Sequence, residues 1–245
     1  MNPELRKRFV DSIEYLREMG FFQDYHNLSS EEILDKILKG EINYKDQWFI
    51  EKDIEKMGEK YWEERRREGR TYGQFLKKSL EEQEEHWIKA SDSKVDLEMV
   101  FFDTKRVFIE DPETIVAKDM GIALMKKLAR ISKGVFNPTG MRESWSKWRG
   151  KPPPEVKKYF YRNYGYWNKC SVFFKLGGEK YAVDFYCGGD RLLADLAVKK
   201  INELIKDTGY QYYRLHGEIE GIVYTVFSND EVEKLKKKGW LISLP

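Results

Sequence analysis

The sequence predicts an α+β protein, with about four helices over residues 1–92 and an antiparallel or mixed sheet with helices packed on it over residues 93–245. Three observations lead to this fold class. Apolar residues recur at helical spacing in the first region and alternate at strand spacing in parts of the second. The order of elements after residue 94 places hairpins between helices, which favours a layer of helices on one face of a sheet.

Start and stop signals define the elements of the helical region. Asn2 and Pro3 suit the cap and the first position of a helix. Ser29 and Glu32 have the spacing of a capping box, in which each side chain bonds to the other residue's backbone N–H. Glycines follow the first three apolar patterns, as is common at helix ends. The expected helices run from Pro3 to Gly20, from Ser29 to Gly40, from Lys45 to Glu68 and from Thr71 to Trp87.

Gly177-Gly178 is a two-residue turn between two alternating segments, the pattern of a tight β-hairpin. Pairing across this turn sets Leu176 opposite Glu179 and creates one almost wholly apolar face, so the turn and the alternation specify the same register. Cys187 lies diagonal to Cys170 on that face, about 7–8 Å away between Cα atoms, which is too far for an easy disulfide. We therefore expect two buried free thiols. The further pairs are Phe174 with Tyr181, Val172 with Val183, and Cys170 with Phe185.

The other elements of the sheet domain alternate between strands and helices. Apolar and polar residues alternate over 95–101, which predicts a strand. Asp111-Pro112-Glu113 has the cap, proline and acid of a helix start, and Asp190 is expected to cap a later helix. Residues 135–169 show no clean period and are expected to form a long loop. The expected strands are 95–101, 107–109, 210–215, 222–227 and 241–244, and the expected helices are 111–134, 190–209 and 228–239.

Composition and charge limit the class of protein. Charged residues make up 35% of the chain, which is typical of a highly soluble protein or of a heat-loving source. The net charge of +2 gives no overall attraction to polyanions. The first residues lack the apolar stretch of a signal peptide, and no apolar run approaches the ~20 residues of a membrane span. We therefore expect a cytoplasmic protein without membrane contact, whose thiols are reduced.

Positive charge and aromatic rings are concentrated in residues 142–169, which we call the basic-aromatic segment. It holds eight Lys and Arg residues against two acids, interleaved with eight aromatic residues. Cations neutralise phosphates and exposed rings stack on unpaired bases, so the segment predicts a surface for single-stranded nucleic acid or for an acidic partner. The alternative is that the rings anchor a long loop to the sheet while the cations stay in water. The candidate binding residues are Arg142, Trp145, Trp148, Arg149, Lys157, Lys158, Arg162 and Trp167.

Other clusters give weaker signals. Asp184, Asp190 and Asp195 are close in sequence, but a hard cation needs several converging oxygens, and Asp190 is already expected as a cap. The three histidines are far apart and no Cys-x-x-Cys spacing exists, so no metal and no other cofactor is predicted. The sequence favours a non-catalytic interaction module that holds a macromolecular partner, another protein or single-stranded nucleic acid, through the basic-aromatic segment. The alternatives are a single-stranded nucleic-acid-binding protein and an enzyme whose site is assembled from distant residues.

Overall fold

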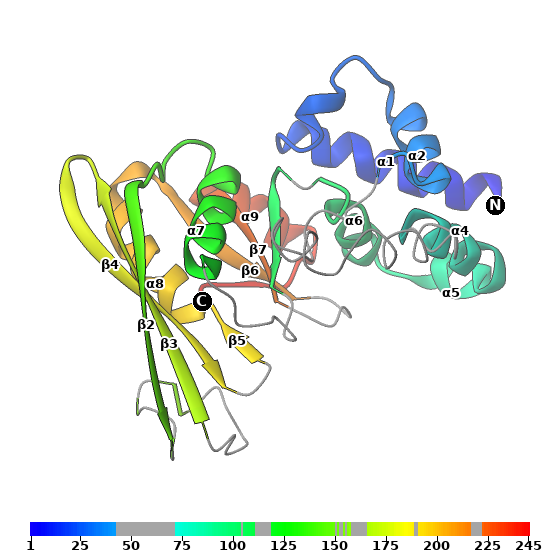
Figure 1. Ribbon diagram of the computed structural model, residues 1–245. Helices are drawn as coiled ribbons and strands as arrows, with labels where there is room; N and C mark the ends of the chain where they lie inside the picture. Colours follow the sequence, from blue (N-terminus) through cyan, green and yellow to red (C-terminus); the bar gives the residue numbers. More distant parts are fainter. Residues whose placement is uncertain are drawn as a thin grey trace. The chain divides into compact units, whose positions relative to one another are not determined.

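The computed structural model describes residues 1–42, 72–103, 105–110, 119–149, 151, 154, 156–157, 166–188, 191–216 and 222–245 (Figure 1). These residues form an α+β protein, as predicted. The chain divides into two compact units. The helical unit comprises Met1–Val107 and Glu233–Trp240, and the sheet unit comprises Phe108–Val232 and Leu241–Pro245. The chain thus leaves the helical unit, builds most of the sheet unit and then returns. The domain boundary expected at residue 92 stays a prediction.

The helical unit is built from short helices whose caps follow the predicted signals. Asn2 caps the first helix by accepting a hydrogen bond from a backbone N–H, and Pro3 is its first residue. Ser29 and Glu32 form the predicted capping box at the start of the second long helix. The elements are α1 (Pro3–Glu18), η1 (Gln23–Tyr25), α2 (Ser30–Lys39), α4 (Tyr72–Glu82), α5 (Glu84–Lys89) and α6 (Asp92–Val100).

Residues 95–101, predicted as a strand, instead belong to α6 and the turn after it. Ser91 Oγ accepts a hydrogen bond from the Lys94 N–H at 3.3 Å and so caps the helix. The prediction is wrong because a short run with an extra apolar residue at Val100 satisfies the helical period as well as the alternating one. The helix buries one face, and it packs against α1. The buried residues of α6 are Val95, Asp96, Met99 and Val100.

A buried carboxylate, Asp96, holds the returning segment Glu233–Trp240 in the helical unit. The Trp240 Nε1–H donates a hydrogen bond to Asp96 Oδ2 at 3.1 Å, and Lys238 Nζ lies 2.8 Å from the same oxygen. Asp96 is 1% exposed, whereas Lys238 keeps 28% of its side chain in solvent. Lys238 Nζ also lies 3.6 Å from the centroid of the Tyr15 ring. Burial, together with the charge of Asp96, raises the pKa of the Tyr15 hydroxyl above its ordinary value.

The last helix, α9 (Asn229–Lys237), begins and ends as predicted. The Ser228 N–H donates to the Glu231 carboxylate at 2.7 Å, and the Glu231 N–H donates to Ser228 Oγ at 3.3 Å, which completes a capping box. Gly239 has a φ of +88°, a left-handed conformation that glycine adopts without strain. This turn lets the Trp240 N–H donate to the Leu235 carbonyl at 3.0 Å, so Trp240 folds back on the helix end.

Two four-stranded sheets make up most of the sheet unit, with strand orders β1-β7-β6-β8 and β2-β3-β4-β5. Helix α7 packs on β2 and β3, while α8 contacts β4 of one sheet and β6 of the other. The strands are β1 (Val107–Glu110), β2 (Thr139–Arg149), β3 (Tyr166–Leu176), β4 (Glu179–Gly188), β5 (Arg191–Leu193), β6 (Tyr210–Leu215), β7 (Ile222–Ser228) and β8 (Ile242–Ser243). The remaining elements are α7 (Met120–Ile131), α8 (Asp195–Ile205) and η3 (Lys206–Thr208).

Tyr212 lies at the centre of the sheet unit, where several elements meet. The Asn202 side chain of α8 bonds to the Tyr212 backbone twice, accepting from its N–H at 2.7 Å and donating to its carbonyl at 2.9 Å. The Tyr212 hydroxyl donates to the Leu128 carbonyl of α7 at 2.7 Å, and burial raises its pKa above the ordinary value. The Phe136 ring packs edge-on against both Tyr212 and Phe174, which joins the two sheets.

The hairpin predicted around Gly177-Gly178 is confirmed in full. Strands β3 and β4 pair with Leu176 opposite Glu179 and with every further predicted pair in register. The predicted apolar face is largely buried. Cys170 and Cys187 are buried free thiols, as expected.

The segment 135–169 is not a long loop, because residues 139–149 form the long strand β2, which pairs with β3. The prediction failed because β2 carries almost no aliphatic residues: its strand character comes from pairing and not from an apolar face of its own. A second correction concerns the helix expected from Asp190. Strand β5 comes first, and α8 begins at Asp195.

Several predictions fall on residues outside the described part of the chain. These are the third helix over 45–68, the Thr71 cap, the Asp111-Pro112-Glu113 helix start, and the Asp190 cap. The helix predicted from Thr71 to Trp87 is seen as α4 and α5, which break at Gln83. In the described ranges, no helix combines the length and the apolar character that crossing a membrane requires.

Replacing Asp96 with Ala should lower the free energy of unfolding by about 2 kcal/mol, because it leaves the Trp240 N–H and the Lys238 ammonium without their acceptor. Urea denaturation followed by tryptophan fluorescence measures this change. Asp92→Ala is the matched control on the same helix, where the carboxylate is 71% exposed and pairs with Arg8. If both variants lose the same stability, Asp96 does not hold the returning segment.

Candidate functional site

The sheet β2–β3–β4 presents two different faces. One face contains Cys170 and Val172 of β3, which lie under α7. Part of the opposite face, near β5, is covered by a buried cluster of Val156, Trp167, Tyr186 and Leu193. The rest of that opposite face, toward the Gly177-Gly178 turn, is exposed. We call this exposed part the open face; its residues are Arg142, Ser144, Ser146, Lys169, Ser171, Phe173, Lys175, Lys180, Ala182 and Asp184.

On the covered face, Glu143 of β2 acts as the cap of α7. Its carboxylate accepts hydrogen bonds from the backbone N–H groups of Asp119 and Ile122 at the start of the helix. It also accepts a hydrogen bond from the Trp145 Nε1–H at 2.8 Å. A carboxylate at this end of a helix is favoured by the partial positive charge of the free N–H groups. The indole N–H of Trp145 is therefore engaged within the sheet unit, where it orients the capping carboxylate of Glu143.

Gly121 allows α7 to approach the sheet closely. A Cβ at this position would overlap Cys170 Sγ and Val172 Cγ2, so any larger residue would push the helix away from β3. Cys170 Sγ lies 3.7 Å from a Glu143 carboxylate oxygen. Burial, and secondly the charge of Glu143, raises the pKa of the Cys170 thiol well above its ordinary value. This thiol is accordingly a packing group, because the reactive form of cysteine is the thiolate.

On the open face, Arg142 of β2 lies directly opposite Phe173 of β3. The Arg142 guanidinium carbon is 5.1 Å from the centroid of the Phe173 ring, a cation–π contact. Phe173 is 37% exposed, although phenylalanine is usually buried, and Arg142 is exposed as well. The face therefore offers a flat aromatic and guanidinium surface to solvent.

Two lysines extend this surface toward the hairpin turn. Lys175 and Lys180 are directly opposite each other on β3 and β4, and both are exposed. Within the described ranges, no carboxylate forms an ion pair with either lysine. Like charges in directly opposite positions destabilise a sheet. The pair therefore carries a local cost that no contact in the described part of the chain offsets.

One acid lies on the open face. Asp184 of β4 accepts a hydrogen bond from Ser171 Oγ at 2.6 Å, and Lys169 Nζ is 3.5 Å from its other oxygen. The acid thus pairs with Lys169 and leaves Arg142, Lys175 and Lys180 as positive groups. Serine hydroxyls of β2 and β3 lie in the next two rows from Arg142, on the side away from Lys175 and Lys180. Each hydroxyl can both donate and accept a hydrogen bond.

The predicted binding residues separate into three groups. Arg142 lies on the open face, and Arg149 and Lys157 are exposed elsewhere in the sheet unit. Trp167 is fully buried and Trp145 is half-buried against Glu143, so neither is a free ring. Lys158 and Arg162 lie outside the described residues, as does the side chain of Trp148, whose backbone pairs with that of Trp167.

Three residues that sequence reasoning did not select share the open face with Arg142: Phe173, Lys175 and Lys180. The sequence did hold a signal for Phe173. This residue lies in the polar row of a strand whose other row is apolar. A large ring in a polar row of a confirmed hairpin is an exposed ring.

A buried ion pair in the second sheet was also not predicted. Asp195, at the start of α8, accepts a hydrogen bond from the Tyr224 hydroxyl at 2.5 Å. Its second oxygen lies 3.2 Å from Arg214 Nη1, and the Asp195 side chain is 1% exposed. Asp195 thus joins α8 to Arg214 of β6 and Tyr224 of β7, and both of its carboxylate oxygens have partners within the fold. We assign it to structure.

Comparisons with known proteins give no family for this chain: no protein-family model, no curated protein and no solved structure matches it. Among the described residues, no three or more His, Cys, Asp and Glu side chains are grouped so that they could hold a metal ion. The chemistry of the open face is therefore the main guide to function.

The Cys170 thiol of the folded protein should react with iodoacetamide at pH 8.5 far more slowly than a free cysteine. The reason is that its raised pKa keeps the thiol protonated at a pH where an ordinary thiol near pKa 8.5 is half ionised. Mass spectrometry of the alkylated peptides measures the rate. The same chain in urea is the control, and it should be labelled quickly. Rapid labelling of Cys170 in the native protein would contradict its assignment as a packing group.

Lys175→Glu should stabilise the fold by about 0.5 kcal/mol, because it converts a like-charge pair with Lys180 into an opposite-charge pair. Thermal and urea unfolding at low salt measure the change. Lys199→Glu, at an exposed position of α8, is the control for a general effect of charge reversal. A loss of stability in Lys175→Glu would mean that the lysine pair already has a compensating partner.

Proposed function

We propose that this protein is a binding module that holds single-stranded nucleic acid on the open face of β2–β3–β4. The observation that carries the proposal is the exposed Phe173 ring under the Arg142 guanidinium, in the row next to Lys175 and Lys180, which have no ion-pair partner among the described residues. Rings and guanidinium planes stack on unpaired bases, and lysines neutralise phosphates. The open face supplies both kinds of contact on adjacent strands.

The spacing of these groups supports a ligand that extends over several units. The row of Arg142 and Phe173 is two residues from the row of Lys175 and Lys180 along β3, which corresponds to about 7 Å. A base stacked on the first row therefore places its neighbouring phosphates within reach of the lysine side chains. The serines of the face add hydrogen bonds to phosphate or sugar, which position a chain without selecting its sequence.

Local charge explains how a nearly neutral protein can bind a polyanion. The whole chain carries a net charge of only +2. The open face has Arg142, Lys169, Lys175 and Lys180 against a single acid, Asp184, within its described residues. Binding through such a patch releases counterions from the nucleic acid, so affinity should fall as salt concentration rises.

The direct test is fluorescence anisotropy of labelled oligo(dT) and oligo(U) with the full chain, at increasing salt. We expect binding that weakens with salt, and a loss of about tenfold in affinity for Lys175→Glu/Lys180→Glu, because two phosphate contacts are reversed. Phe173→Leu should lower affinity about fivefold or more, since it keeps an apolar group but removes the stacking ring. Lys199→Glu serves as the matched charge control and should bind as the native protein does.

Three results would contradict the proposal. These are the absence of binding at low salt, binding that does not respond to salt, and equal loss of affinity in Lys199→Glu and in the double lysine variant. The single variant Lys175→Glu is measured beside the double variant, and because it is expected to stabilise the fold, its weaker binding cannot be attributed to unfolding.

An acidic protein segment is a second candidate partner, favoured by the position of β2. This eleven-residue strand is at the edge of its sheet in the described part of the chain, and it is basic overall. An extended acidic peptide could pair with such an edge through its backbone. Polyaspartate competition distinguishes the two: Phe173→Leu should leave peptide binding unchanged, whereas it should weaken nucleic-acid binding.

A further inference from the structure

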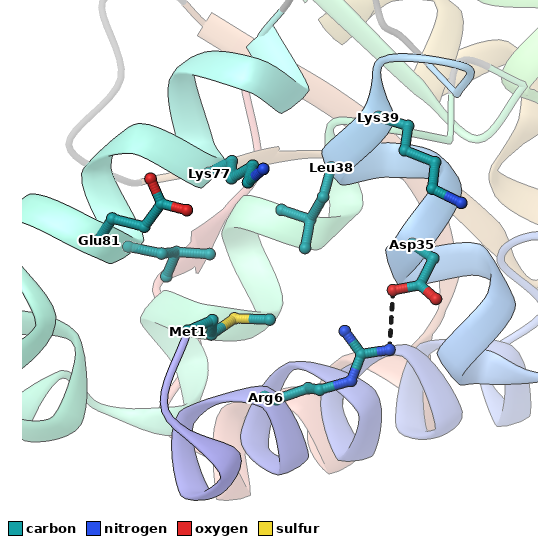
Figure 2. A pocket seen from close by; sticks show the side chains of 8 residues that line it. Met1, Arg6, Asp35, Leu38, Lys39, Lys77 and Glu81 are labelled. Atoms are coloured by element: carbon teal, nitrogen blue, oxygen red, sulfur yellow. Dashed lines mark hydrogen bonds and ion pairs between the residues drawn. The ribbon is translucent and has the colours of Figure 1, made fainter.

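A pocket of about 300 Å³ lies in the helical unit, far in sequence from the open face (Figure 2). Helices α1, α2 and α4 supply its walls, together with the first residue of the chain. Its volume is at the lower end of the range seen for small-molecule sites, roughly 300–1,000 Å³. The lining residues are Met1, Arg6, Asp35, Leu38, Lys39, Lys77, Leu80 and Glu81.

One side of the pocket is apolar. Met1 and Leu38 extend into the hollow from opposite sides, as Figure 2 shows, and Leu80 is 1% exposed. Met1 is 40% exposed and Leu38 is half-buried, so both retain surface that a ligand can cover. Covering such surface is favourable, because it removes apolar area from water.

The charged groups of the pocket are not equivalent. Arg6 Nη2 is 2.7 Å from Asp35 Oδ1, so these two charges satisfy each other at one wall (Figure 2). Lys77 extends from α4 toward Leu38. In the part of the chain that the structure describes, no ion pair involves Lys77 or Lys39. Glu81, one helical turn after Lys77 on α4, is the second acid of the lining.

We propose that this pocket binds a small amphipathic carboxylate, a ligand with one negative headgroup and a short apolar chain. The headgroup pairs with the Lys77 ammonium, and the chain covers Met1 and Leu38. The lining carries three cations, Arg6, Lys39 and Lys77, against two acids, Asp35 and Glu81. This net positive charge beside an apolar wall selects the chemistry, because a cationic ligand meets like charge and a fully polar ligand leaves the apolar wall exposed. The pocket is independent of the proposed nucleic-acid surface, so either can fail alone.

Octanoate is the probe, titrated into the full chain and followed by calorimetry and by ¹H–¹⁵N NMR shifts of α2 and α4. We expect saturable binding of octanoate, weaker binding of octanol and no binding of octylamine at the same concentrations. Lys77→Glu should reduce octanoate affinity about tenfold, because it replaces the attractive headgroup contact with a repulsive one. Lys78→Glu is the matched control: it is the next residue of α4, is exposed, and does not line the pocket.

A second variant tests the pocket without weakening it. Asp35→Ala removes the partner of Arg6 and frees a guanidinium at the wall, so octanoate should bind about threefold more tightly. The proposal is overturned if octanoate shifts no resonances of the lining residues, if octylamine binds equally well, or if Lys77→Glu and Lys78→Glu lose the same affinity. Circular dichroism of each variant confirms that the helices are retained.

Discussion

The turn at Gly177-Gly178 is the constraint on which the candidate surface depends. Both glycines have positive φ, +59° and +92°, and this conformation joins two strands with only two residues between them. The tight turn leaves one register for β3 and β4, and side chains alternate strictly from that point. The same alternation that buries Val172 and Cys170 brings Phe173 and Lys175 to solvent. A slip of one residue would exchange the core and the surface.

Strand β2 extends this arrangement by a different mechanism. It has few apolar side chains to bury, and its position rests on backbone pairing with β3 and on the polar contacts of Glu143 with the start of α7. The helix thus receives its cap from a strand that is distant in sequence. Because Glu143 faces α7, its neighbour Arg142 must face the opposite side, where it meets Phe173. The orientation of β2 therefore decides both that Glu143 caps α7 and that Arg142 is exposed on the opposite face.

Local signals were sufficient wherever the structure is decided by neighbours in sequence. The Asn2 cap, the capping boxes at Ser29 and Ser228, and the glycine hairpin are contacts over two to four residues, and all were predictable. Strand β2 was not predictable, because its polar residues are explained only by Cys170 and α7, which are brought to them by the fold. The short run in α6 matched both periods, and only packing on α1 decides between them. For the site, composition identified the basic-aromatic segment and Arg142, but the neighbours of Arg142 depend on the register between β2 and β3.

The return of the chain to the helical unit affects the order in which the molecule can be completed during synthesis. Residues 233–240 belong to the same compact unit as the first hundred residues, and Asp96 receives its two partners from Lys238 and Trp240. A ribosome delivers the chain from its N-terminus, so α1 and α6 emerge long before that segment exists. Most of the sheet unit lies between them in sequence and emerges before the returning segment does. Asp96 is therefore made more than 140 residues before the two groups that bond to its carboxylate, and it lacks both of them until the last residues of the chain are made.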